Sequence, residues 1–121
     1  MKKKIFLVDD DKEITGMTEI ALRTNGYNCL VANESSEVVA RAEKEKPDLI
    51  ILDIMMPGID GTDLNIALKV NSATKNIPVI FLTGIIKKSE EEKSPDQQNI
   101  VLAKPFSIYE LLSMIKSLLG G

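Results

Sequence analysis

The sequence contains no histidine and no tryptophan, and its only cysteine is Cys29. One cysteine cannot form a disulfide within the chain, and without histidine it has no companion ligand for a zinc-type metal site. The thiol lies in an apolar-leaning stretch from Tyr27 to Ala32, where a buried structural cysteine is the simpler interpretation. A metal bound by this chain would therefore be held by oxygen atoms.

Long apolar runs and clusters of positive charge are also absent. No stretch of 18 apolar residues occurs, and the apolar run after Met1–Lys4 is too short for a signal peptide, so we expect a cytoplasmic protein without membrane contact. The 15 basic residues are scattered among 18 acidic ones, for a net charge of −3, which argues against direct nucleic-acid binding. The length of 121 residues and 44% apolar content predict one domain over residues 1–121.

Five short apolar segments, rich in β-branched residues, alternate with segments of helical spacing. The third and fourth are almost continuously apolar, as is typical of strands covered on both faces. The alternation indicates an α/β fold with a five-stranded parallel sheet, doubly wound, with helices on both faces. The expected strands are Lys4–Val8, Asn28–Ala32, Leu49–Leu52, Val79–Leu82 and Ile100–Leu102.

Helical spacing marks the segments between these strands. The first helix should bury one face and end at Asn25-Gly26. The second should be capped by Ser35 or Ser36 and stopped by Pro47, and the last should begin with a capping box of Ser107 and Glu110. The segment 85–99 has almost no apolar stripe and should form a short, frayed or displaced helix. The expected buried positions are Ile14, Met17, Ala21 and Leu22 in the first helix, Val38, Val39 and Ala42 in the second, and Leu64, Ala67 and Leu68 in the third.

Polar side chains follow four of the expected strands, and the carboxyl ends of parallel strands meet at one edge of the sheet. Asp9–Asp11 follow the first strand, Asp53 the third, Thr83-Gly84 the fourth and Lys104-Pro105 the fifth. Three or four carboxylates without histidine or thiolate predict a site for a hard divalent cation. Mg²⁺ fits best, with Mn²⁺ as the alternative.

A cation, a hydroxyl and an ammonium group around one further carboxylate are the groups that phosphoryl transfer needs. Asp53 can be the acceptor. Taken singly, the residues have simpler interpretations: Asp9–Asp11 could cap a helix, Asp53 could open a turn, and Thr83 and Lys104 could lie on the surface. Their convergence on one edge favours the chemical interpretation.

In these features the sequence resembles the receiver domain of bacterial two-component response regulators. The resemblance rests on LVDDD (7–11), DIMMPGIDG (53–61), FLTG (81–84) and AKPF (103–106), and it extends from about Lys4 to Leu119. It implies that Asp53 is the phosphoacceptor and that Asp10, Asp53 and the backbone carbonyl of Met55 bind Mg²⁺ directly, with Asp9 acting through water. It also implies that Thr83 and Lys104 each contact a phosphoryl oxygen.

The resemblance implies a phosphorylation-dependent switch that takes a phosphoryl group from a sensor histidine kinase or a histidine phosphotransfer protein. Such a domain catalyses its own phosphorylation and dephosphorylation rather than the turnover of a separate substrate. Because the chain closes with Gly120-Gly121, we expect no effector domain after it, whether it is a stand-alone regulator or a domain excised from a longer protein. Val101 stands where the family prefers Tyr or Phe, and Met55 and Ile85 occupy rim positions that can hold a hydrolytic water.

Three other functions are open at this point. A receiver-fold interaction module that signals without phosphate would suit the altered Val101 position. A haloacid-dehalogenase-type phosphatase would carry a second Asp two residues after the first, where this chain has Met55. A flavodoxin-like flavin binder would need a neutral or glycine-rich first loop, and Asp9–Asp11 would repel the flavin phosphate.

Overall fold

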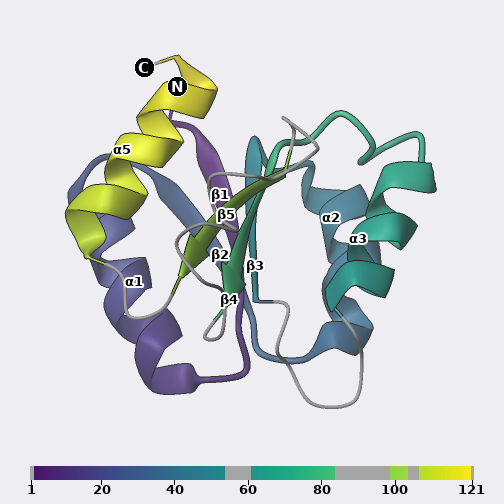
Figure 1. Cartoon of the computed structure of the whole chain (residues 1–121), viewed down its shortest axis with the longest axis horizontal. Helices are drawn as coiled ribbons and strands as arrows, with labels where there is room; N and C mark the ends of the chain where they lie inside the picture. Colours follow the sequence, from purple (N-terminus) through teal and green to yellow (C-terminus); the bar gives the residue numbers. More distant parts are fainter. Residues whose placement is uncertain (1, 54–60, 84–98, 104–106, 121) are drawn as a thin grey trace.

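The computed structural model describes residues 2–53, 61–83, 99–103 and 107–120, and these contain one five-stranded sheet (Figure 1). Every strand pair is parallel, and the order β2-β1-β3-β4-β5 is that of a doubly wound, flavodoxin-like sheet. The predicted fold class is confirmed, and each predicted strand agrees with the structure to within one residue at either end. The strands are β1 (Lys4–Val8), β2 (Asn28–Ala32), β3 (Leu49–Asp53), β4 (Val79–Thr83) and β5 (Asn99–Ala103).

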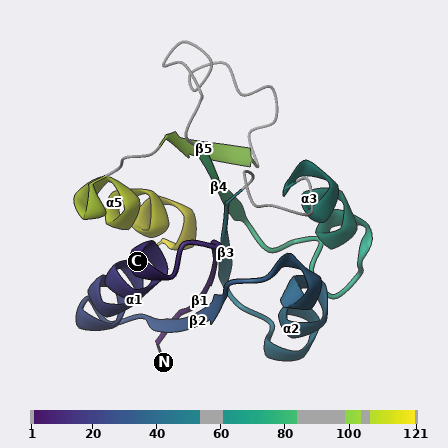
Figure 2. The same ribbon diagram turned by 90° about the horizontal axis from the view of Figure 1, so that it is seen from below.

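Helices cover both faces of the sheet, with α1 and α5 on one side and α2 and α3 on the other (Figure 2). The helix predicted within 85–99 lies outside the described residues, except that Asn99 begins β5. None of the described helices is long and apolar enough to span a membrane. The helices are α1 (Lys12–Thr24), α2 (Val38–Glu45), α3 (Gly61–Val70) and α5 (Ile108–Leu119), and a single 3₁₀ turn, η1 (Ser35–Glu37), precedes α2.

Alternate residues along each central strand supply two separate hydrophobic cores. In β1, Phe6 and Val8 pack towards α2 and α3, whereas Ile5 and Leu7 pack towards α1 and α5. All residues of β3 are buried, because this strand lies at the centre of the sheet with helices on both sides. The continuous apolar pattern of β3 and β4 is therefore the consequence of burial on both faces.

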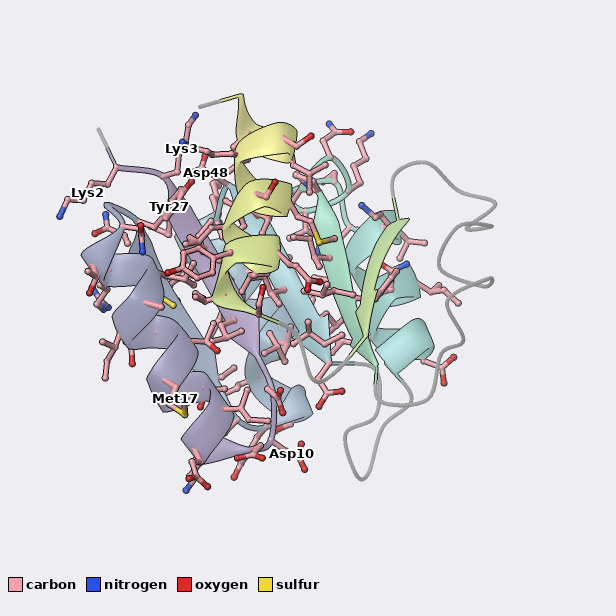
Figure 3. The ribbon with its side chains drawn as sticks, turned by 60° about the vertical axis from the view of Figure 1, so that its left-hand side comes forward. Lys2, Lys3, Asp10, Met17, Tyr27 and Asp48 are labelled. Carbon is pink, nitrogen blue, oxygen red and sulfur yellow. The ribbon has the colours of Figure 1, made fainter. Side chains whose placement is uncertain are left out.

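The buried face of α1 differs from the prediction at Met17, whose side chain is 69% exposed (Figure 3). The prediction is confirmed for Leu22, which is buried, whereas Ile14 and Ala21 are only partly buried; Thr15 and Thr18 complete the buried stripe. At about 100° per residue, Met17 lies roughly 130° around the helix from the middle of that stripe. The prediction placed only apolar residues on the buried face of α1, and it therefore missed the two buried threonines.

The start of α2 also differs from the prediction, because neither serine caps the α-helix. Ser35 begins η1, and the N-cap is Glu37, which has helical backbone angles and no side-chain capping bond. A serine cap requires an extended backbone at the capping residue, and the preceding 3₁₀ turn replaces that geometry. The predicted stop is confirmed, since Lys46 adopts a left-handed conformation immediately before Pro47. The Ser107 cap of α5 is also confirmed, with its hydroxyl 3.1 Å from the N–H of Glu110.

Two arginines lie along the outer edge of β2, which is an edge strand. Arg23 of α1 donates a hydrogen bond to the carbonyl of Cys29, and Arg41 of α2 donates one to the carbonyl of Val31, both at 2.6 Å. Each arginine also forms an ion pair with the glutamate four residues before it. The distance is 3.3 Å between Arg23 and Glu19 and 3.2 Å between Arg41 and Glu37. Helices on both faces of the sheet thereby satisfy carbonyls that β1 leaves unpaired.

Candidate functional site

Asp9, Asp10 and Asp53 come together at the carboxyl edge of the sheet. Asp9 directly follows β1 and Asp53 ends the adjacent strand β3, where Val8 pairs with Leu52. The chain continues from β1 to β2 on one side, and β3 lies on the other side, so this is the topological switch point of the sheet. Ligands of open α/β sheets bind at that point.

One carboxylate oxygen from each of these three aspartates lies within 4.8 Å of the other two. Asp9 is 0% exposed and Asp53 is 2% exposed, whereas Asp10 is open to solvent. Figure 3 shows Asp10 at the end of the molecule opposite Lys2, Lys3 and Asp48. Two buried carboxylates and one exposed carboxylate thus form a site that solvent can reach from one side.

Hydrogen bonds fix the backbone of the acidic loop, Asp9–Asp11. The N–H of Asp9 donates to the carbonyl of Ala32 at 3.1 Å, and the N–H of Asp11 donates to Oδ1 of Asp9 at 3.0 Å. The carboxylate of Asp11 turns away to cap α1, accepting from the N–H groups of Glu13 at 3.0 Å and Ile14 at 3.2 Å. The prediction that Asp11 begins the first helix rather than joining the site is confirmed.

The donor set fits a hard divalent cation. Three carboxylates held close together repel one another, and a cation among them relieves that repulsion. Only oxygen atoms are offered, and the solvent-facing side leaves room for water and phosphate oxygens, as Mg²⁺ requires. Among the described residues, no other group of three acidic, histidine or cysteine side chains converges in this way.

The remaining predicted site residues are placed only in part. Thr83 is the last residue of β4, which is next to β3 and pairs Leu82 with Asp53, so the backbone of Thr83 reaches the same edge. Lys104 and Met55 lie outside the described residues, although Lys104 follows directly on β5.

One contact to the acidic loop was missed from the sequence. Asn33, immediately after β2, donates from Nδ2 to the backbone carbonyl of Asp9 at 2.8 Å. The rule that pointed to the ends of the other four strands applies to β2 as well and would have found this residue.

The family model of the response regulator receiver domain matches residues 5–116. This chain belongs to that family. The family resemblance expected from the motifs is thereby confirmed, and the phosphatase and flavin-binder alternatives are set aside. Receiver domains of response regulators are phosphorylation-dependent switches of two-component systems, and this is the general function of the chain.

Curated relatives of the receiver domain are longer proteins. The phosphate regulon transcriptional regulatory protein PhoB of Pseudomonas aeruginosa is 38% identical, over 97% of this chain and 52% of its own length. The alkaline phosphatase synthesis transcriptional regulatory protein PhoP of Bacillus subtilis is 33% identical, over 98% of this chain and 49% of its own length. The chain thus spans about half the length of these two relatives.

Solved structures match the receiver domain along nearly its whole length. A response regulator from Desulfuromonas acetoxidans is 33% identical with a TM-score of 0.85, covering 98% of this chain and 97% of that chain. The chemotaxis response regulator CheY4 of Vibrio cholerae is 28% identical, also with a TM-score of 0.85, covering 98% and 99%. The sheet order and the arrangement of helices are therefore those of solved proteins of this family.

Proposed function

We propose that this receiver domain accepts a phosphoryl group on Asp53 from the phosphohistidine of a sensor histidine kinase or a histidine phosphotransfer protein, in a Mg²⁺-dependent reaction. The observation that carries the proposal is the position of Asp53. Its carboxylate ends the central strand β3, is 2% exposed, and lies with Asp9 and Asp10 in a cluster whose oxygens are within 4.8 Å. A buried carboxylate beside two others, at the carboxyl edge of the sheet, is an arrangement that suits a divalent cation and a phosphoryl acceptor, which supports a chemical role.

In the proposed reaction a carboxylate oxygen of Asp53 forms a bond to phosphorus while the bond from phosphorus to the donor imidazole nitrogen breaks. The electron pair of the broken bond stays on the imidazole, and an acyl phosphate remains on Asp53. The hydroxyl of Thr83 would donate a hydrogen bond to one phosphoryl oxygen, and the ammonium group of Lys104 would pair with another. Both residues follow from the family motifs. Thr83 ends β4, the neighbour of β3, and Lys104 follows β5 in the sequence.

The residues that would hold the metal are Asp10 and Asp53, with the backbone carbonyl of Met55 and with Asp9 acting through water. Bound Mg²⁺ supplies positive charge that offsets the charge on the phosphoryl oxygens during transfer. The buried Asp9 has a second task, because its Oδ1 accepts the N–H of Asp11 and so shapes the loop that carries Asp10.

Phosphorylation by a small donor tests this proposal. The wild-type chain and Asp53→Asn are incubated with acetyl phosphate and Mg²⁺, and intact mass is measured at intervals. We expect one added phosphoryl group in the wild type, none in Asp53→Asn, and none in the wild type with excess EDTA. Asp48→Asn is a matched control, because Asp48 lies at the other end of the molecule (Figure 3) and should leave labelling unchanged.

Equal labelling of wild type and Asp53→Asn would refute Asp53 as the acceptor, and full labelling in EDTA would refute the metal requirement. A wild-type chain that is labelled under no condition, yet still binds a signalling partner, would favour the interaction module that works without phosphate.

A further inference from the structure

The side chain of Asn33 connects the acidic loop to helix α1. Its Nδ2 donates one hydrogen bond to the carbonyl of Asp9 at 2.8 Å and a second to the hydroxyl of Thr15 at 3.2 Å. Thr15 is 3% exposed, and its hydroxyl in turn donates to the carbonyl of Lys12 at 3.1 Å. Asn33 itself is partly buried, and the proposed phosphoryl transfer does not assign it a role.

The strand pairing explains why a side chain makes this contact. Between the parallel strands β1 and β2, the N–H of Asn28 donates to the carbonyl of Lys3, and the N–H of Asp9 donates to the carbonyl of Ala32. A ladder that continued with the same two-residue step would bring the N–H of residue 34 to the carbonyl of Asp9. However, β2 ends at Ala32, and the amide of Asn33 supplies the donor that the strand no longer provides.

The contact matters for the site because of the peptide group that it holds. The carbonyl of Asp9 belongs to the peptide that leads into Asp10, and the orientation of that peptide sets the direction in which Asp10 leaves the backbone. Asp10 is exposed, so packing does little to fix it, whereas Asp9 is held at its N–H by Ala32 and at its carbonyl by Asn33.

We infer that Asn33 is a positioning residue of the metal site, which holds the Asp9–Asp10 peptide so that the Asp10 carboxylate meets those of Asp9 and Asp53. This inference rests on the proposed metal-dependent function. Partners of metal ligands that lie outside the coordination sphere commonly change metal affinity by about 10-fold to 100-fold. Because Asn33 orients a backbone group rather than a carboxylate, we expect the lower end of that range.

Titration of the full chain with MgCl₂ by calorimetry provides the test. Asn33→Ala should raise the Mg²⁺ dissociation constant about tenfold. The matched control is Asn25→Ala, which removes a similar bond at the far end of α1, from Nδ2 of Asn25 to the carbonyl of Ala21 at 2.7 Å. The control should change the dissociation constant less than about twofold, since no site residue depends on that bond.

A second variant separates positioning from charge. Asn33→Asp has nearly the same size but lacks the N–H donor, and it adds a negative charge that would by itself attract Mg²⁺. If positioning dominates, Asn33→Asp binds Mg²⁺ more weakly than the wild type. Tighter binding in this variant would show that local charge governs the affinity and would overturn the inference.

Two further measurements make the outcome decisive. In the metal-free protein, the amide hydrogen of Asp11 should exchange faster in Asn33→Ala than in the wild type or Asn25→Ala, because its acceptor on Asp9 is less well held. Urea unfolding without metal reports any loss of stability, which a purely structural role would produce without a change in Mg²⁺ affinity. An unchanged Mg²⁺ dissociation constant in Asn33→Ala would refute the positioning role of Asn33 and leave the proposed function intact. A wild-type chain that binds no Mg²⁺ would refute the proposed Mg²⁺-dependent function itself.

Discussion

Two neighbouring aspartates should respond to truncation in opposite ways. Asp10→Ala removes a carboxylate from the cluster of three, and Asp11→Ala removes the cap of α1, whose carboxylate accepts from Glu13 and Ile14. We expect Asp10→Ala to lose Mg²⁺ affinity and to gain stability without metal. Asp11→Ala should lose stability and keep its Mg²⁺ affinity.

The magnitudes follow from the geometry of the two side chains. Two unit charges at 4.8 Å, the upper limit of the separations in the cluster, repel by roughly 0.9 kcal/mol in water. Asp10 has two such neighbours and is exposed, so relief of the repulsion should add about 1 kcal/mol to the free energy of unfolding after screening by salt. Loss of the Asp11 cap should subtract about 1 kcal/mol. Loss of a direct ligand should weaken Mg²⁺ binding at least about 100-fold, equivalent to roughly 2.7 kcal/mol.

Urea unfolding with and without Mg²⁺ measures all of these effects. At a Mg²⁺ concentration about 20 times the wild-type dissociation constant, the metal should stabilise the wild type and Asp11→Ala by roughly 1.8 kcal/mol. Under the same conditions Asp10→Ala, with 100-fold weaker binding, should gain only about 0.1 kcal/mol. Equal losses of metal stabilisation in the two variants would refute the assignment of Asp10 to the site and of Asp11 to the helix.

Three other predictions concern Cys29, Lys104, and the pair Met55 and Ile85. Burial raises the pKa of the Cys29 thiol to about 11, with Glu19 adding to the rise and Arg23 opposing it. Because the unfolded chain loses this proton at a lower pH than the folded chain, the contribution of the thiol to stability should be complete below about pH 9 and decline as the pH approaches 11. Urea unfolding of wild type and Cys29→Ser at several pH values would show this decline. Lys104→Ala should slow phosphorylation by acetyl phosphate yet leave the melting temperature unchanged or raised, since its charge acts on the phosphoryl oxygens, and unfolding without loss of phosphotransfer would contradict this. The phosphoryl group on Asp53 should persist for minutes to hours, because the side chains of Met55 and Ile85 cannot hold a hydrolytic water by hydrogen bonds. The double variant Met55→Asn with Ile85→Glu should speed phosphate release about tenfold. A wild-type half-life of seconds would count against this explanation.

The central strands β1, β3 and β4 could be predicted closely because burial on both faces leaves an uninterrupted apolar run that polar residues end abruptly. The buried face of α1 could not be predicted from the sequence. Threonine has a polar side chain, but it can be buried when its hydroxyl forms a hydrogen bond, as that of Thr15 does with the carbonyl of Lys12. Met17 fits the helical spacing of the apolar residues equally well, so spacing alone cannot exclude it. Only the packing of the helix on the sheet distinguishes the two faces.

The three clustered carboxylates could be predicted because strand ends in a parallel sheet share one edge. The difference between the buried Asp9 and the exposed Asp10 could not be predicted, since it depends on how the chain turns after β1. The strand-end rule would have placed Asn33 at this edge, but it could not show that the side chain bonds to the carbonyl of Asp9, because an asparagine after a strand is also a common turn residue. Hydrogen bonds between segments far apart in sequence were the part that needed the structure.

The arginines along β2 have a consequence for how other proteins can approach this domain. An extended peptide that joined the sheet by β-augmentation would have to displace the bonds from Arg23 and Arg41 to the carbonyls of Cys29 and Val31. Hydrogen bonds from charged groups contribute about 1.5–3 kcal/mol each, and both guanidinium groups are also held by glutamates. Strand addition at this edge, which in many sheets leads to swapped or fibrous aggregates, is therefore disfavoured. At the β2 edge, neighbouring proteins would therefore bind through side chains on the helices and loops rather than by lengthening the sheet, which favours selective contacts even at high protein concentration.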